Sequence, residues 1–166
     1  MTERAIEQTF KLVEQLEKEA KARDPNFKRR AADYPVIATN VGIRSAGGMG
    51  QSYNLSPDTI GRIHDREGVI GLIMAQHQLG RTWAKPRSRD LLYQHINAIH
   101  AVTKDYRACA IGTDIDGFIK PTLTGIKRAP DLKRLEQWIR ADYDGDADAI
   151  LYDNAMRVLD RACAWR

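Results

Sequence analysis

Residues 69–75 of the chain read VIGLIMA, an uninterrupted apolar run. A strand covered on both faces, as in a parallel sheet, has this continuous pattern, whereas a half-exposed strand alternates polar and apolar residues. Two shorter segments of the same kind lie on either side along the chain, PVIAT at residues 35–39 and ACAIG at residues 108–112. We therefore predict three buried strands that belong to one sheet.

Helical patterns separate these strands. Residues 3–21 place Ile6, Phe10 and Val13 on one face, and residues 88–103 repeat such a stripe. Between them, SPD at residues 56–58 is a strong helix start, with a serine N-cap, a proline in the first turn and an acid beside it. Two further helices are expected at residues 130–141 and 146–164.

This alternation of strands and helices predicts an α/β fold of parallel strands joined by crossover helices. We expect a single domain over residues 1–166, made of the N-terminal helix 3–21, three βα units and two C-terminal helices. The loops that leave the strands are long (40–54, 76–86 and 114–128), and those that enter them are short. Ligands of such folds bind at the C-terminal ends of the strands, so a site is expected there.

Composition excludes several classes of function. The chain has 166 residues, 43% of them hydrophobic and 29% charged, with a net charge of +4. These values fit one soluble, folded domain, and no block of like charges indicates a nucleic-acid partner. No apolar stretch approaches the roughly 20 residues of a membrane helix, and the N-terminus does not resemble a signal peptide. Cys109 and Cys163 lie far apart, so no disulfide scaffold is expected. We expect a cytoplasmic protein without a membrane or nucleic-acid partner.

The strongest local signal for chemistry is GTDIDG at residues 112–117, where the third predicted strand ends. Asp114 would leave the strand toward the mouth of the sheet, where a carboxylate could bind metal, hold a substrate ammonium or shuttle a proton. Asp116 could instead cap the turn at Gly117, which is a common structural role for an acid before glycine.

Other candidate motifs fail on spacing. The acidic stretch DYDGDAD at residues 142–148 has glycine at the fourth position of a calcium loop and Asp153 at the twelfth, where such loops need glycine sixth and glutamate twelfth. We interpret it as a turn and a helix start, with Asp146 as N-cap. The glycines at 47–50 lack a dinucleotide or P-loop pattern and indicate a flexible loop.

The four histidines form no HxH or HExxH motif. His95 and His100 lie about 140° apart around one helix, so they cannot share a metal. His77 follows the second strand and could face the site. Surface or supporting roles are expected for all four, including His64.

Several segments, taken in order, resemble the membrane (renal) dipeptidase family of zinc metallopeptidases. They are PVIATN at 35–40, NLSPD at 54–58, GVIGL at 68–72, HI at 95–96 followed by Ile99, IGTDIDG at 111–117 and NAMRV at 154–158. Their order and spacing are similar to the C-terminal portion of that family over nearly the whole chain.

The resemblance implies a partial (β/α)8 TIM-type barrel, of which the three strands would be the last three. It also implies a binuclear zinc centre and hydrolysis of dipeptides by a metal-bridging hydroxide, assisted by the aspartate that corresponds to Asp114. Asn40 stands where the family has a metal-binding histidine. Tyr53 replaces an arginine that binds the substrate carboxylate, and Arg44 is a nearby substitute.

The chain departs from that family in its ligands. An amide oxygen at Asn40 is a weaker zinc ligand than imidazole, and the family's other metal ligands have no counterpart here. We therefore expect a truncated metallo-dipeptidase that is incomplete or inactive as an isolated chain and needs a missing N-terminal half or self-association through its sheet edges. The alternative is a degenerate, non-catalytic relative that serves as a binding or scaffold subunit.

Overall fold

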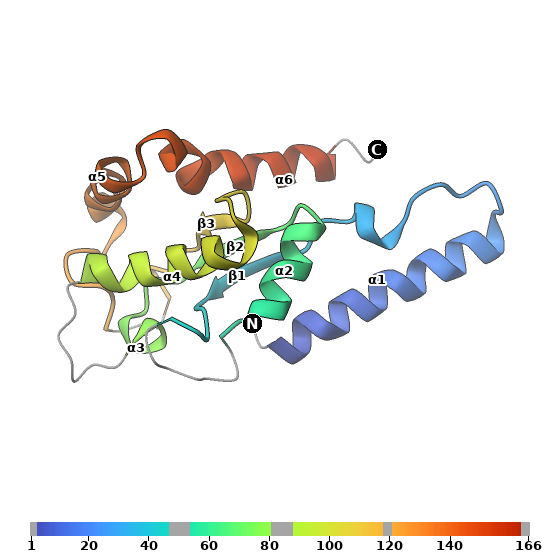
Figure 1. The fold of residues 1–166 in the computed structure, drawn as a ribbon, viewed down its shortest axis with the longest axis horizontal. Helices are drawn as coiled ribbons and strands as arrows, with labels where there is room; N and C mark the ends of the chain where they lie inside the picture. The colour runs from blue at the N-terminus through green and yellow to red at the C-terminus, as the bar shows by residue number, and fades with distance from the viewer. Residues whose placement is uncertain (1–2, 47–53, 81–87, 118–120, 164–166) are drawn as a thin grey trace.

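A computed structural model describes residues 3–46, 54–80, 88–117 and 121–163. Its centre is a three-stranded parallel sheet in the order β1-β2-β3 (Figure 1), formed by Ile37–Val41, Val69–Leu72 and Cys109–Ile111. Ile37 pairs with Val69, and Ile70 pairs with Cys109. The predicted α/β class, with parallel strands and crossover helices, is confirmed.

Six α-helices accompany the sheet in the described part of the chain: α1 (Glu3–Arg23), α2 (Pro57–Asp65), α3 (Gln76–Leu79), α4 (Ser88–Thr103), α5 (Leu132–Asp142) and α6 (Asn154–Cys163). Short 3-10 turns lie at Ala31–Asp33, Ala129–Asp131 and Asp144–Asp146, and a π-helical segment at Ala149–Asp153 leads into α6. None of the described helices has both the length and the apolar character to cross a membrane.

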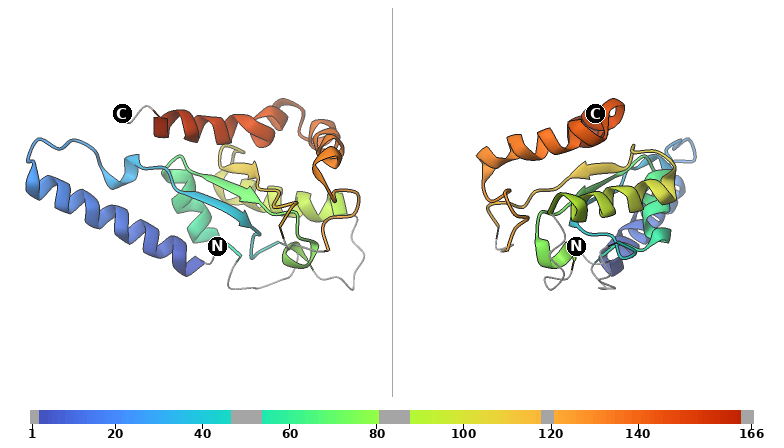
Figure 2. Two further views of the ribbon diagram at one scale, coloured as in Figure 1. Left: turned by 180° about the vertical axis from the view of Figure 1, so that it is seen from behind. Right: turned by 60° about the vertical axis from the view of Figure 1, so that its left-hand side comes forward.

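The helices cover the sheet from two sides (Figure 2). Helices α2 and α4 share a core with Ile70 and Leu72 of the central strand. Because side chains alternate along a strand, Val69 faces the other way, and there it packs with Ala110 and with Val158 of α6. The central strand is therefore buried on both faces, as its continuous apolar sequence predicts.

The start of α2 shows how local sequence places an element. The Ser56 side chain accepts a hydrogen bond from the Thr59 amide at 3.3 Å, and Pro57 is the first helical residue. Ile60 and Ile63 then face the core with no exposed surface. This helix begins where the serine–proline–aspartate motif predicts.

Some boundaries differ from the sequence-based expectation. Strand β1 spans Ile37–Val41 and not residues 35–39; Pro35, at the predicted start, has no amide to donate to a neighbouring strand. The predicted loop 76–86 contains the short helix α3, since the Gln76 amide bonds to the Pro121 carbonyl at 2.9 Å and so fixes the chain there. Residues 81–87 lie outside the described residues. Asp146 is the last residue of a 3-10 turn and not an N-cap.

Glycines allow the strands to curl together at their C-terminal ends. A Cβ added at Gly112 would lie 2.9 Å from the Gly71 carbonyl oxygen and 3.1 Å from the Asn40 amide nitrogen. A Cβ at Gly71 would lie 3.2 Å from the Gly112 Cα. The ends of β1 and β3 thus approach each other across β2, so the sheet is curved but open.

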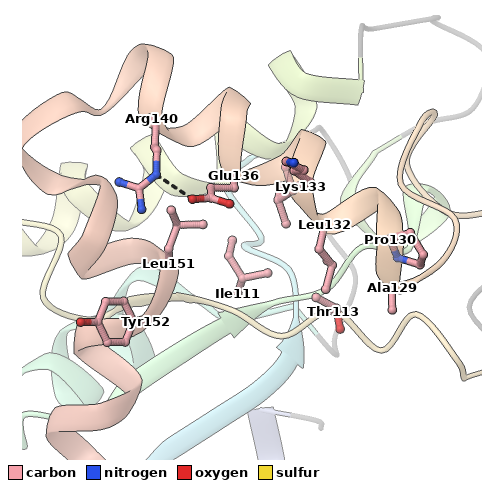
Figure 3. Close-up of a pocket in the computed structure, with 11 residues that line it drawn as sticks. Ile111, Thr113, Ala129, Pro130, Leu132, Lys133, Glu136, Arg140, Leu151 and Tyr152 are labelled. Atoms are coloured by element: carbon pink, nitrogen blue, oxygen red, sulfur yellow. Dashed lines mark hydrogen bonds and ion pairs between the residues drawn. The ribbon is translucent and has the colours of Figure 1, made fainter.

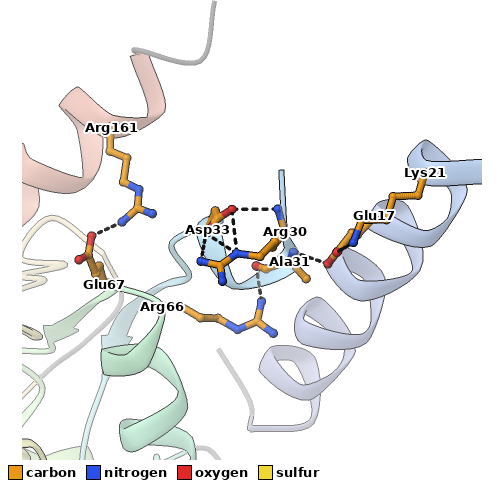
Figure 4. Close-up of polar contacts among 8 residues, drawn as sticks. All are labelled: Glu17, Lys21, Arg30, Ala31, Asp33, Arg66, Glu67 and Arg161. Carbon is orange, nitrogen blue, oxygen red and sulfur yellow. Dashed lines mark hydrogen bonds and ion pairs between the residues drawn. The ribbon is translucent and has the colours of Figure 1, made fainter. Parts of the chain in front are cut away.

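Polar contacts fasten α1 to the segment that enters β1 (Figure 4). Glu17 of α1 accepts from the Ala31 amide as well as from Lys21, and Arg66 donates to the Ala31 carbonyl at 2.9 Å. The Arg66 guanidinium also lies 4.7 Å from the centre of the buried Phe10 ring. These contacts lie at the opposite end of the sheet from the predicted site.

Candidate functional site

Asn40 and Asp114 occupy the C-terminal ends of the two outer strands. Asn40 lies at the irregularity in β1 where the pairing register shifts, and Asp114 follows the end of β3. Both have left-handed backbone angles, with φ of 61° and 49°. Asparagine and aspartate tolerate this region better than other non-glycine residues, but it remains a strained conformation that clusters at functional sites.

A tight turn follows Asp114. The Gly117 amide donates to the Asp114 carbonyl at 3.0 Å, while Ile115 is buried and Asp116 is exposed. The Asp114 carboxylate lies over Gly117, where an added Cβ would be 2.5 Å from Oδ1. The buried isoleucine thus anchors the turn, and Asp114, not Asp116, supplies the carbonyl that closes it.

A polar chain of contacts connects the end of β1 with the loop after β2. Gln78 of α3 donates from Nε2 to the Asn40 carbonyl at 3.4 Å. The carbonyl of Gln78 accepts from Nδ2 of the buried Asn54 at 3.1 Å. The backbone position of Asn40 is therefore set by residues far from it in sequence.

His95 of α4 forms hydrogen bonds with the loop after β1 and with helix α3. Its Nδ1 accepts from the Ile43 amide at 2.8 Å, and its Nε2 donates to the Leu79 carbonyl at 2.7 Å. Burial lowers the pKa of His95 to about 4, so the ring is neutral at ordinary pH. His95 therefore has the supporting role that we expected for the histidines.

Sequence reasoning did not identify the partners of His95, Gln78 or Asn54. A signal existed for His95, which lies in α4 on the same face as Leu92, Ile96 and Ile99. A polar residue on a buried helical face requires a hydrogen-bond partner. No comparable signal marked the other two.

Arg44 and Tyr53 are the two residues predicted to bind the substrate. Arg44 is partly buried, and its Nη2 donates to the Asn54 carbonyl at 3.1 Å, so it stabilises its own loop. Tyr53 and the glycine stretch 47–50 lie outside the described residues. His77 lies exposed in α3.

The described residues do not fit a binuclear zinc centre. Within residues 3–46, 54–80, 88–117 and 121–163, no three or more histidine, cysteine, aspartate or glutamate side chains gather closely enough to hold a metal ion. Cys109 offers no thiolate, because burial raises the pKa of its thiol to about 12. Residues 142–148 run from the end of α5 through the 3-10 turn Asp144–Asp146.

Comparison with solved structures shows that this chain shares its fold with part of two metallopeptidases. One is the dipeptidase AC, a metallopeptidase, with 20% identity and a TM-score of 0.66. Another is a metallopeptidase from Rhodobacter sphaeroides bound to a phosphinate mimic of the dipeptide L-Ala-D-Ala, with 21% identity and a TM-score of 0.64.

Both matches cover 79% of this chain, but only 39% and 38% of the solved chains. No family model matches the sequence, and no curated protein matches it. The likeness therefore establishes the fold, a partial barrel-type α/β domain whose sheet is open.

Proposed function

We propose that this chain is the substrate-facing portion of a dipeptidase-type metallohydrolase, with Asp114 as its acid–base residue. One observation carries the proposal. Asn40, near the end of β1, and Asp114, after the end of β3, both have left-handed backbone angles, and the two strands curl toward each other across Gly71. In barrel folds this is the end of the sheet where ligands bind.

A metallohydrolase of this type needs a bound metal. Because the described residues contain no group of three metal-binding side chains, the metal would depend on residues elsewhere. Asn40 contributes an amide, which is a poor zinc ligand but a good hydrogen-bond partner for a peptide. We therefore assign Asn40 to substrate contact and assign the metal to polypeptide beyond the described residues.

The substrate class follows from the comparison. The Rhodobacter sphaeroides enzyme was solved with a dipeptide mimic, and we propose dipeptides as substrates of the site to which this chain contributes. A non-catalytic scaffold is the second candidate, and the incomplete set of ligands favours it. A dipeptidase portion should recognise a dipeptide at this end of the sheet, whereas a scaffold should not.

Titration of L-Ala-D-Ala into the isotopically labelled chain, followed by NMR, tests the proposal. We expect amide shift changes around Asn40 and Asp114 at millimolar dipeptide, since only part of the site is present. Asp114→Asn should abolish these changes, and Asp116→Asn should retain them, because Asp116 is an exposed acid on the same turn. Absence of shifts at the strand ends, or identical shifts in both variants, would favour the scaffold.

A further inference from the structure

Two helical segments of the described part of the chain expose apolar side chains in rows. On α1, Leu12 and Leu16 lie one turn apart and are 55% and 53% exposed. On α6 and the π-helical segment before it, Tyr152, Met156 and Leu159 follow at intervals of four and three residues and are 58%, 43% and 51% exposed. This spacing places each set on one helical face. Adjoining exposed apolar side chains of this kind mark interaction surfaces.

The apolar face of α1 borders a hollow of about 300 Å³ between the helix and the segment that follows it. Val13, Leu16 and Ala20 line the hollow from α1, and Phe27 and Tyr34 line it from the other side. A side chain of the size of methionine or tyrosine can enter such a volume. Helix α1 therefore offers a receptor surface for a side chain of another helix.

A row of charges of one sign runs beside each apolar face. The basic row on α1 consists of Arg4, Lys11 and Lys18, and the acidic row on α6 and the segment before it consists of Asp153 and Asp160. All five side chains are exposed, and each row repeats every seven residues, which is about two helical turns. Among the described residues, none of the five has an ion-pair partner.

Other charges on the C-terminal helices are already compensated. Arg140 of α5 pairs with Glu136 at 2.9 Å, as Figure 3 shows, and with Asp148 at 2.8 Å. Arg161 of α6 pairs with Glu67 (Figure 4). The acidic row has no such compensation within the described part of the chain, so it remains available to a partner.

We propose that α1 of one molecule packs against α6 of a second copy of this chain. The rows identify the occupant, because the basic row and the acidic row have the same spacing and opposite sign. The two helices do not meet within one molecule, since they lie on different sides of the sheet (Figures 1 and 2). This inference goes beyond the proposed function and uses none of its residues.

The flanks on which the charges lie determine the direction of the contact. Viewed from the N-terminus of each helix, with about 100° per residue, the basic row lies anticlockwise of Leu12, and the acidic row lies clockwise of Met156. Such opposite flanks meet when two helices run parallel, as the e and g positions do in a parallel coiled coil. We therefore infer a parallel pair of helices.

The common spacing pairs Lys11 with Asp153 of the second copy and Lys18 with Asp160. Exposed ion pairs are weak, so the apolar faces supply most of the affinity, and the charges select the partner and the direction. Because α1 and α6 lie on different sides of the molecule, each copy uses α1 toward one neighbour and α6 toward another. Such a head-to-tail contact continues beyond a dimer.

Sedimentation equilibrium over a range of concentrations tests the inference on the whole chain. We expect the mean mass to rise with concentration, past that of a dimer, because a small contact gives a weak association. A monomer at every concentration would overturn the proposal.

Charge reversal tests the two rows. Asp153→Lys with Asp160→Lys, or Lys11→Asp with Lys18→Asp, should weaken association about tenfold or more, because like charges then face each other. An equimolar mixture of these two double variants should associate again, since each offers the other a row of opposite sign. A mixture that stays monomeric would contradict the pairing of the rows.

The matched control for charge is Asp65→Lys with Asp144→Lys. It changes the net charge by as much as reversal of the acidic row does, at two exposed acids outside that row. Association should remain as in the unchanged protein. An equal loss in the control would show an effect of net charge alone and would overturn the assignment.

Apolar substitutions separate the helices from the sheet. Leu16→Gln should weaken association several-fold, because Leu16 is exposed on α1 and borders the hollow. Ile37→Gln should leave it unchanged, since Ile37 is an exposed apolar residue of β1 outside both helices. Equal or reversed effects would overturn the proposal. None of these readouts depends on a dipeptide or on zinc, so this proposal and the proposed function fail separately.

Discussion

At the scale of single residues, the protonation state of the buried His95 affects the contacts that hold the site in place. It has no role as a ligand in the described part of the chain, but it holds the loop after β1 and helix α3 to helix α4. The ring must be neutral for Nδ1 to accept the Ile43 amide proton. Protonation of Nδ1 would therefore break the contact with Ile43 and loosen the loop after β1, at the end of the sheet that carries Asn40.

The pKa of His95 predicts how stability depends on pH. Burial lowers this pKa from 6.5 to about 4, so between these values the unfolded chain binds the proton and the folded chain does not. The contribution to folding is complete above about pH 6.5 and is lost as the pH falls toward 4, by about 3 kcal/mol in all. Urea unfolding at pH 7 and pH 4.5 checks this.

The control for that measurement is His95→Gln, which removes the titration. The variant should be less stable at pH 7, yet it should lose less stability than the wild type between the two pH values. Carboxylates with lowered pKa values, such as Asp33, also weaken the fold in acid and do so in both proteins. Equal losses in the two proteins would exclude His95 as the cause.

At the scale of elements, the apolar runs predict the strands well, because burial on both faces leaves a continuous pattern in sequence. The same pattern does not define the length of a strand. Residues 69–75 are all buried, but the ladder of β2 ends at Leu72. Helix α3 has no local signature, since its position depends on Pro121, which is far away in sequence.

The sequence likewise predicts one part of the candidate site and not the other. The apolar run at residues 108–112 predicts where β3 ends, and so it predicts that Asp114 lies at the C-terminal end of that strand; the acid–base role of Asp114 stays a prediction. The contacts of Gln78 with Asn40 and of Asn54 with Gln78 join helix α3 to strand β1 and to the segment before α2, so neither spacing nor composition encodes them.

Asn154, at the start of α6, provides a prediction at this scale. Its Nδ2 donates to the Tyr106 and Cys109 carbonyls at 2.7 and 2.8 Å and so closes part of the β3 edge. Asn154→Ala would leave these carbonyls without a donor and should lower the free energy of unfolding by about 1–3 kcal/mol. Asp153→Ala, at an exposed neighbour, should change it by less than about 0.5 kcal/mol. Comparable losses in chemical unfolding would refute the role of Asn154.

At the scale of the whole molecule, parallel pairing places Asn40 and Asp114 at the same end of the sheet, and the curvature of the sheet brings the ends of β1 and β3 toward each other. That curvature requires glycine at position 112, where an added Cβ would contact backbone atoms of both β2 and β1. Backbone atoms cannot move aside as the tip of a side chain can, so any side chain at position 112 would force the strands themselves to shift.

Gly112→Ala should therefore destabilise the chain by about 1–3 kcal/mol. It should also shift the Asn40 and Asp114 amide resonances. Gly145→Ala is the matched control, because nothing lies within 4 Å of a Cβ there. The control should be neutral or slightly stabilising, by up to about 1 kcal/mol. A stable Gly112→Ala protein with unchanged resonances would show that the strands are less tightly curled than described.

We propose that this chain presents a dipeptide-facing strand end, and its described residues do not form a complete metal site. Zinc content, measured together with dipeptide hydrolysis on the purified chain after sizing by light scattering, tests this claim most directly. We expect clearly substoichiometric zinc and no turnover for the isolated chain. Near-stoichiometric zinc with turnover would contradict it, because the chain would then assemble a complete site by itself or through its own oligomer.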